Sequence, residues 1–338
     1  MRVNGIGLTA SVWYPPRRQT VDEAIAAGDI DPAGAQTLGY DALPVSDGVP
    51  PPDMAVRAAR DVLDRADADP QDLATVLHAS VHYQGHDAWS APHYIANRLG
   101  ADGATPIGLL QQCNGGAVGV ELAALTVRHG GRPALVTTAD RFLLPSWHRW
   151  LSDYGMAAGD AGTAVLVGPL GAGRPDLLLH AVATASASEL ELMHRGDDGL
   201  NGNPLEHSSM IDVRRPKRDY VTTVGVAPFV KAADDRITAV VSGSLREAGL
   251  RPDDERLRYA VVPRLGVKAL ADIYLPPLTR ATRAEVLDLG RSSGHVGAGD
   301  LNASLAEVTA RLAPGEYALV LNGGGGFSFT SVIVSAPL

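Results

Sequence analysis

Short runs of β-branched and aliphatic residues alternate along the chain with stretches in which apolar residues recur every three or four positions. The first pattern predicts buried strands and the second predicts amphipathic helices. Their alternation is typical of an α/β fold with mostly parallel strands. The predicted strands are residues 3–13, 75–81, 106–110, 134–139, 161–167, 177–185, 258–262, 286–289, 317–321 and 327–334. The predicted helices are residues 54–66, 91–99, 117–125, 222–248 and 301–312.

Proline and glycine indicate where several of these helices begin and end. Pro50, Pro51 and Pro52 stand before Asp53, which we interpret as a stop followed by an N-cap residue. The helix that follows the only cysteine should end near residues 129–131, because glycine is common just beyond a helix C-terminus. The long stretch 222–248 is predicted as an interrupted helix.

Each half of the chain closes with two successive predicted strands. These pairs are 134–139 with 161–167, and 317–321 with 327–334. We interpret the repetition as an internal duplication with a seam near residues 169–175. On this interpretation residues 1–170 form an N-terminal half that carries the candidate nucleophile, and residues 171–338 form a C-terminal half.

Composition limits the class of protein more than it identifies one. The chain of 338 residues has a formal net charge of −9, which argues against a nucleic-acid-binding surface. Glycine, proline or charge interrupts each apolar stretch before it reaches the ~20 residues that a membrane helix needs. Residues 1–14 contain one arginine and no long apolar core, so they predict a first strand and not a signal peptide. One cysteine and no targeting segment together favour the cytoplasm.

Cys113 is the only cysteine, and it lies between an apolar run and a helix-like stretch. This pattern puts a thiol at the first turn of a helix, where the helix dipole and free backbone N–H groups stabilise a thiolate. Gly115 and Gly116 follow it, so a substrate or another backbone segment could approach closely. A lone cysteine cannot form an internal disulfide, so Cys113 is either an inert buried thiol or a nucleophile.

His295 and Asp300 lie in a glycine-rich loop between a predicted strand and a predicted helix. Ligands of open α/β sheets bind at such carboxyl ends of strands. His295 could deprotonate Cys113 and Asp300 could orient the imidazole, as in covalent catalysis by a nucleophile, base and orienting carboxylate. The alternative is that Asp300 only caps the helix that follows, because aspartate is a common N-cap residue.

The glycine run 323–326 follows a predicted strand, as a phosphate-binding loop would. Such loops must open a helix, whereas Phe327 and the residues after it continue as a strand. The glycines therefore predict a hairpin. Backbone N–H groups of that hairpin could stabilise an oxyanion, or the glycines could simply form a tight turn.

Two further clusters have structural explanations at least as good as functional ones. Four histidines lie close together in sequence at His78, His82, His86 and His93, but strand character around residues 75–81 argues against converging metal ligands, so we predict no metal site. An aromatic and basic cluster consists of Trp147, Arg149 and Trp150, and it favours packing over a ligand platform.

The polar, glycine-rich segment 196–216 is predicted as a long loop, and long loops in compact folds often form lids or walls of binding sites. His194 and His207 lie in or beside this segment and could assist an acceptor. A solvated loop histidine is the alternative for each.

Three motifs together resemble those of the thiolase superfamily, and within it the ketoacyl-ACP synthase III-like enzymes. They are residues 112–116 around the nucleophile, 159–165 for a Gly-Asp strand and 324–329 for a C-terminal glycine hairpin. The likeness runs over nearly the whole chain. It implies a five-layered αβαβα fold with internal duplication, an obligate homodimer and no cofactor. It also implies that Cys113 accepts an acyl group from acyl-CoA or acyl carrier protein, with the N–H groups of Cys113 and Gly325 as the oxyanion hole.

The chain departs from the condensing members of that family at two positions. Arg264 stands where those enzymes have a histidine in a Pro-His-Gln-Ala-Asn motif, and His295 stands where they have an asparagine. This pattern resembles a divergent branch from polyketide biosynthesis that uses a nucleophile–His–Asp triad, which here implies Cys113, His295 and Asp300. That branch includes starter-unit synthases and acyltransferases.

The resemblance also bears on the substrates. The tryptophan and arginine that hold the adenine of coenzyme A in housekeeping members have no clear counterpart, which favours a carrier protein as donor. Three candidate substrate or acceptor residues are Arg264, His194 and Trp89. We therefore expect an acyltransferase acting on a small-molecule or carrier acceptor. The alternatives are a starter-unit synthase that condenses with malonyl carrier protein, a thioester hydrolase, and a non-catalytic ketosynthase-like partner subunit.

Overall fold

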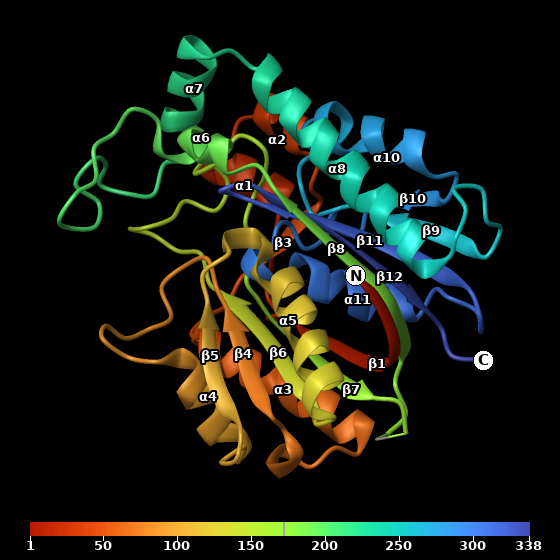
Figure 1. Cartoon of the computed structure of the whole chain (residues 1–338). Coiled ribbons are helices and arrows are strands. Elements are labelled where there is room, and N and C mark those ends of the chain that lie inside the picture. The colour runs from red at the N-terminus through yellow and green to blue at the C-terminus, as the bar shows by residue number, and fades with distance from the viewer. Residues whose placement is uncertain (172) are drawn as a thin grey trace.

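A single curved sheet runs through the computed structural model, which describes residues 1–171 and 173–338 (Figure 1). In the described residues the sheet has ten strands in the order β10-β9-β11-β12-β8-β1-β7-β6-β4-β5. The strands are β1 (Arg2–Trp13), β4 (Thr75–Ala79), β5 (Thr105–Leu109), β6 (Ala134–Asp140), β7 (Ala161–Pro169), β8 (Leu177–Ser186), β9 (Leu257–Val261), β10 (Glu285–Leu287), β11 (Tyr317–Gly324) and β12 (Ser328–Ser335). A separate small ribbon pairs β2 (Arg18–Thr20) with β3 (Ala42–Pro44).

The helices follow the predicted pattern, with several additions. They are α1 (Val21–Ala27), α2 (Pro32–Leu38), α3 (Pro51–Ala66), α4 (Ala91–Leu99), α5 (Gly115–Gly130), α6 (Leu192–Arg195), α7 (Arg214–Thr223), α8 (Ala227–Ala248), α9 (Val267–Ala269), α10 (Leu275–Ala281) and α11 (Asp300–Thr309). A π-helical stretch at Leu270–Tyr274 joins α9 to α10. Among the described residues no helix is both long enough and apolar enough to cross a membrane.

Three apolar cores give the fold its layers. The central core packs α5 and α11 between strands from both halves of the chain. A second core lies under α3 and α4 on the outer face of the strands from the first half, and a third lies under α8 and α10 on the outer face of those from the second half. This is the predicted αβαβα arrangement, in which layers of helices alternate with the strands of the two halves (Figure 1).

The strands in the described part of the chain form two sets of five with the same order. In the first set β1 is followed across the sheet by β7, β6, β4 and β5, and in the second β8 is followed by β12, β11, β9 and β10. The two sets join where β1 and β8 pair antiparallel. Among the described strands, parallel pairs occur only on the outer sides of β6 and β11, so the expectation of mostly parallel strands is wrong. Hairpin-like pairs such as β11–β12 need no helical crossover, which allows the mixed sheet.

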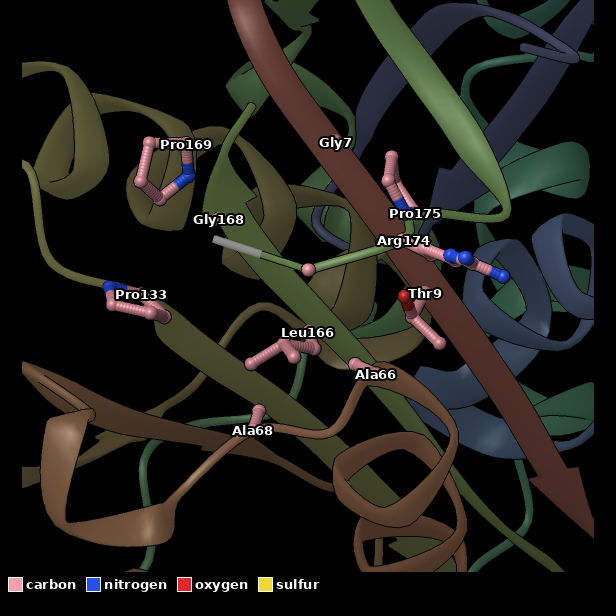
Figure 2. Close-up of a pocket in the computed structure, with 11 residues that line it drawn as sticks. Gly7, Thr9, Ala66, Ala68, Pro133, Leu166, Gly168, Pro169, Arg174 and Pro175 are labelled. Atoms are coloured by element: carbon pink, nitrogen blue, oxygen red, sulfur yellow. The ribbon is translucent and has the colours of Figure 1, made fainter. Parts of the chain in front are cut away.

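The predicted seam runs from the end of β7 to the start of β8. Ala172, within it, lies outside the described residues. A cavity of about 40 Å³ opens at this seam, lined among others by Gly168, Pro169, Arg174 and Pro175 (Figure 2). It is too small for a ligand larger than water, and none of the predicted site residues lines it.

Local chemistry explains where two helices differ from their predicted bounds. Helix α3 begins at Pro51, with Pro50 at the N-cap, so Asp53 is in the first turn and is not the cap. Proline fits the first helical positions because its missing N–H has no partner there. The predicted long helix divides into α7 and α8, and Gly225 lies between them with a φ of +89°.

The small ribbon and helices α1 and α2 were not predicted from the apolar pattern. They enclose a separate apolar cluster in which Leu43 packs with Trp150 and Ala157. Leu43 matters for the site because Gly294, next to His295, lies directly against it. A Cβ atom at Gly294 would be 2.3 Å from Leu43 Cδ2.

Candidate active site

Cys113 lies in a tight turn between the end of β5 and the start of α5. The turn is a 3-10 helix at Gln112–Asn114, and α5 begins at Gly115. Gln112 has a φ of +47°, an uncommon conformation for a residue with a side chain and one that concentrates at functional sites. The thiol is half-buried and free. The structure therefore presents Cys113 at a strained strand-to-helix junction.

The glycines after Cys113 allow the helix to touch the loop that carries His295. A Cβ at Gly116 would lie 2.6 Å from the carbonyl oxygen of Ala298, and one at Gly115 would lie 2.5 Å from Cβ of Ala79. Real Cβ contacts are longer than this, so a side chain at either position would push the two segments apart. The sequence predicted that a substrate or another backbone segment approaches these glycines closely. In the structure, other segments of the protein make this approach.

His295 and Asp300 form a buried pair at the start of α11. Nδ1 of His295 lies 2.6 Å from Oδ2 of Asp300, and the residues are 2% and 1% exposed. Asp300 also accepts the backbone N–H groups of Val296 and Arg264. Gly299 is the N-cap residue of α11 and no side chain caps the helix, so Asp300 is not a simple helix cap.

The environment of His295 favours its protonated form. Burial by itself would lower the pKa of His295, but the charges of Asp300 and Cys113 and the hydrogen bond to Asp300 raise this pKa well above its ordinary value. Nε2 of His295 is buried and forms no well-aligned hydrogen bond with the described residues. Since Nδ1 is held by Asp300, Nε2 is the nitrogen left to interact with Cys113.

Backbone contacts from the first half of the chain fix the loop of His295. The His295 N–H donates to Ala157, and its carbonyl accepts from Gly159. A Cβ at Gly159 would be 2.0 Å from the carbonyl oxygen of Ser293, so the Gly-Asp motif lets these segments pack closely. Asp160 in the same motif accepts the N–H groups of Ser46 and Phe142 instead of facing Cys113.

Asp140, at the end of β6, is a second buried carboxylate in this region. It accepts the N–H groups of Val81 and His82 through Oδ1 and the N–H of Ala298 through Oδ2. Burial raises the pKa of Asp140 to about 7, although these three donors partly oppose the shift. Asp140 thus ties the loop of His295 to the segment after β4. Only its place at a strand end could have suggested it.

The glycine hairpin lies against the backbone of Cys113. The turn between β11 and β12 begins at Gly325, and a Cβ at Gly324 would be 2.5 Å from the backbone nitrogen of Asn114. Nδ2 of Asn322 donates to the Cys113 carbonyl at 3.0 Å, and Asn114 donates to Thr330 at 2.9 Å. Asn114 and Asn322 are therefore supporting residues that the sequence reasoning missed. The hairpin continues as a strand, which excludes a nucleotide loop.

Arg264 does not have the surroundings of a substrate or acceptor residue. It is 0% exposed, and its guanidinium donates to the Leu289 carbonyl and to Ser293 and forms an ion pair with Glu307. The backbone N–H of Arg264 donates to Oδ2 of Asp300 at 3.1 Å. Sequence position alone could not show that the side chain points into this ion pair.

The other two candidate substrate residues lie in different elements of the fold. Trp89 is 42% exposed in the loop before α4, where its ring packs on Tyr94 with centroids 5.4 Å apart. His194, in α6, lies against the glycine hairpin, and its ring packs edge-on against Phe327. His207 lies in the loop after α6, where Nε2 contacts the Gly199 carbonyl at 3.1 Å.

The remaining clusters are structural. The histidines lie in separate surroundings, with His78 between Thr137 and Gln84, His82 on Ser146 and His93 on Ser90. No group of three metal-ligating side chains occurs within residues 1–171 and 173–338.

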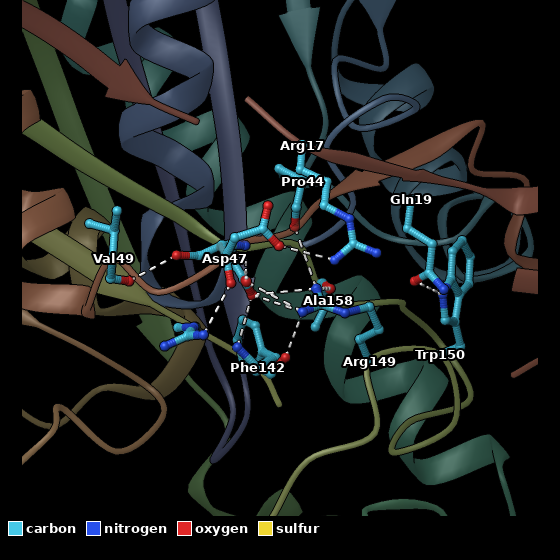
Figure 3. A network of polar contacts seen from close by, with 12 residues as sticks. Arg17, Gln19, Pro44, Asp47, Val49, Phe142, Arg149, Trp150 and Ala158 are labelled. Carbon is cyan, nitrogen blue, oxygen red and sulfur yellow. Dashed lines mark hydrogen bonds and ion pairs between the residues drawn. The ribbon is translucent and has the colours of Figure 1, made fainter. Parts of the chain in front are cut away.

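Figure 3 shows the aromatic and basic cluster, where Arg149 donates to the carbonyls of Phe142 and Ala158 and the indole of Trp150 donates to Gln19. Trp150 is fully buried, and Arg149 also pairs with Asp160 at 3.3 Å. These contacts hold the segment before β7 in place and leave no platform for a ligand.

Comparisons with known proteins agree with this geometry. No protein-family model matches the chain. A beta-ketoacyl-[acyl-carrier-protein] synthase III from Roseiflexus sp. (strain RS-1) is 26% identical over 83% of this chain and 82% of its own length. The solved structure of ChlB3, described as an acyltransferase, is 26% identical and superposes with a TM-score of 0.86 over 99% of this chain and 98% of that one. The 3-oxoacyl-[acyl-carrier-protein] synthase III from Aquifex aeolicus VF5 is 17% identical, with a TM-score of 0.77 over 98% of this chain and all of that one.

The layered fold and these likenesses together define a protein of the thiolase superfamily. Within that superfamily the chain is a ketoacyl-ACP synthase III-like enzyme, as the three motifs implied.

Proposed function

We propose that the protein is an acyltransferase that carries an acyl group on Cys113. In this mechanism Cys113 attacks an acyl thioester, and the N–H groups of Cys113 and Gly325 stabilise the tetrahedral oxyanion. His295 takes the thiol proton of Cys113 and gives it to the departing thiol of the donor. It then takes a proton from the incoming acceptor as the Cys113 thioester breaks. The observation that carries the proposal is the buried His295–Asp300 pair, which leaves Nε2 for Cys113.

The donor in this proposal is an acyl carrier protein or acyl-CoA, and the pathway is polyketide or related specialised metabolism. The Roseiflexus relatives are named for the acyl carrier protein. The ChlB3 structure, described as an acyltransferase, supports transfer over condensation. No tightly bound cofactor is needed, because a cysteine, a histidine and a carboxylate supply the whole exchange.

Decarboxylative condensation is the second candidate function, and the names of the Roseiflexus relatives favour it. It would require His295 to support loss of carbon dioxide from malonyl carrier protein. Arg264, at the position of the usual histidine, is buried in its ion pair with Glu307 and offers no group to that step.

The test is to incubate the protein with short-chain and aromatic acyl thioesters and to measure the mass of the Cys113 peptide. We expect an acyl increment that is absent in Cys113→Ala. No increment with any donor would overturn the proposal. Cysteine-dependent release of carbon dioxide from malonyl carrier protein would favour condensation instead.

We further propose that the protein is a homodimer joined at the edge of the sheet. Strand β5 is an edge strand, and unpaired edges are ready to pair with another chain. Apolar side chains lie exposed on β5 and beside it, with Leu110 89% and Ile107 41% exposed, and Leu125 on the neighbouring α5 is 45% exposed. Sedimentation analysis should give a dimer, and Ile107→Lys with Leu110→Lys should shift it to monomer. A monomeric wild-type protein would contradict this assembly.

A further inference from the structure

The segment after α6 forms an open cavity, and His194, one of its lining residues, lies against the glycine hairpin. The cavity holds about 340 Å³ and is lined by residues between His194 and Pro216, from α6 through the loop to the start of α7. This volume falls in the range of small-molecule sites. Figure 1 shows the loop between α6 and α7 projecting from the body of the molecule.

Ion pairs and backbone contacts hold the walls of this cavity. Asp198 pairs with Arg215, and the Asp198 carbonyl accepts from Arg195 at 3.0 Å. At the far end of the loop, the N–H groups of Ile211 and Val213 donate to the carbonyls of Ser146 and Ser152, both at 2.8 Å. The loop is therefore tied down at both ends.

The lining is polar and carries both donors and acceptors. Asn201, Asn203 and Ser208 contribute neutral groups that can both donate and accept. The charged lining residues are Arg195 and Arg215 against Asp198, Glu206 and Asp212. Both lining arginines are paired, with Glu191 and Asp198, so among the described lining residues neither arginine is free to attract an anion.

His194 connects this cavity to the site of Cys113. A Cβ at Gly325 would lie 2.3 Å from Cε1 of His194, so the ring rests directly on the candidate oxyanion glycine. The next residue, Gly324, rests in turn on the backbone of Asn114 and Cys113. His194 therefore lies between the cavity and the hairpin that touches the backbone of Cys113.

His194 has the properties of a neutral hydrogen-bonding contact. It is accessible to solvent where it lines the cavity, yet protein surrounds it closely. Burial, followed by the charge of Lys217, lowers the pKa of His194 to about 4, with Asp153 opposing the shift. Within the described residues neither ring nitrogen has a hydrogen-bond partner. A neutral imidazole offers one donor and one acceptor to a ligand.

We propose that this cavity binds the acyl acceptor, and that the acceptor is a small neutral or cationic molecule with several hydroxyl or amine groups. The inference rests on the proposed acyl transfer. A hydroxyl or amine of the bound acceptor attacks the carbonyl of acyl-Cys113, so a C–O or C–N bond forms and the C–S bond breaks. The proton of the acceptor passes to Nε2 of His295 and then to the sulfur of Cys113. His194 positions the acceptor and does not itself exchange the proton.

Binding tests the cavity independently of acyl transfer. The probes are methyl glucoside, glucosamine and gluconate, which are neutral, cationic and anionic polyols, observed by saturation-transfer NMR on the Cys113→Ala protein. We expect the first two to bind and gluconate to bind more weakly. His194→Ala and Asn201→Ala should each weaken binding about 3- to 10-fold. His129→Ala, at the exposed far end of α5, is the matched control and should leave binding unchanged.

Transfer is then measured on the isolated acyl-enzyme. We expect the polyol probes to accelerate its discharge, and His194→Ala to raise the acceptor concentration needed for half-maximal rate. Binding of none of the three probes, or equal binding in the two cavity variants, overturns the acceptor site. So does discharge to pantetheine thiol alone. Failure of Cys113 to become acylated would instead overturn the proposed function, while the binding experiment would still decide whether the cavity takes polyols.

Discussion

Nδ1 of His295 lies 2.6 Å from Oδ2 of Asp300, in a position that holds the other ring nitrogen for Cys113. The two residues are five apart in sequence, and the same carboxylate also receives two backbone N–H groups. Three donors on one buried carboxylate fix its orientation and therefore that of the imidazole. Asp300 can orient the imidazole of His295 because its own position is fixed by the two backbone donors.

Asp300→Asn should slow acylation of Cys113 by about 100-fold or more, because general acid–base catalysis depends on a correctly oriented imidazole. The same variant should slow alkylation of Cys113 by iodoacetamide at near-neutral pH. In the wild type this alkylation should be faster than that of a model thiol. A non-catalytic subunit would have no need for such a reactive cysteine. An alkylation rate that is unchanged in Asp300→Asn would show that the pair does not act on the sulfur.

The stability of the protein should depend on pH through His295. Burial lowers its pKa, but Asp300 and Cys113 raise this pKa well above its unfolded value of about 6.5. A histidine with a raised folded-state pKa contributes stability that is fully present below the unfolded pKa and is lost as the pH rises through the folded value. Urea denaturation of wild type and His295→Gln should therefore differ most below pH 6.5, and the difference should shrink towards alkaline pH. A difference that grows with pH would contradict the direction of the shift.

Two glycines of α5 provide a matched pair for the contact between the cysteine helix and the histidine loop. A Cβ at Gly116 would meet the Ala298 carbonyl at 2.6 Å, whereas a Cβ at Gly130 would meet nothing within 4 Å. Gly116→Ala should cost about 1–3 kcal/mol of unfolding free energy and slow acylation, because overpacking pushes Cys113 from His295. Gly130→Ala should be neutral or stabilise by up to about 1 kcal/mol, since alanine is the better helix former. Equal effects in urea denaturation would show that the contact is soft.

The sequence pattern predicted the buried strands and most helices because burial and periodicity are local properties. Strand 134–139 and helix 91–99 agree closely with β6 and α4. The candidate triad was accessible for a similar reason. Cys113 is unique in the chain, and both Cys113 and His295 follow strands, so their meeting follows from the topology of an α/β sheet.

The residues that the sequence did not reveal act across long separations. Asp140 reaches Ala298, 158 positions away, and Asn322 reaches Cys113, 209 positions away. Arg264 was a candidate because of its position in a motif, but its role depends on where the side chain points. The contact of His194 with Gly325 likewise exists only once α6 packs on the hairpin. No local pattern encodes such approaches.

Arg264→Met should separate a structural role from a role in substrate binding. The guanidinium is fully buried, and its partners are Glu307, Ser293 and the Leu289 carbonyl. Removing the guanidinium leaves the Leu289 carbonyl and the buried Ser293 without their donor, so we expect a loss of about 1–3 kcal/mol in urea denaturation. Glu307→Gln is the companion variant and should cost about 3–5 kcal/mol, because it leaves the fully buried Arg264 cation without its charge partner. The backbone N–H of Arg264 remains to hold Asp300, so acylation per folded molecule should be nearly unchanged at low temperature. A folded Arg264→Met protein of wild-type stability with an impaired response to donor or acceptor would instead return Arg264 to the binding site.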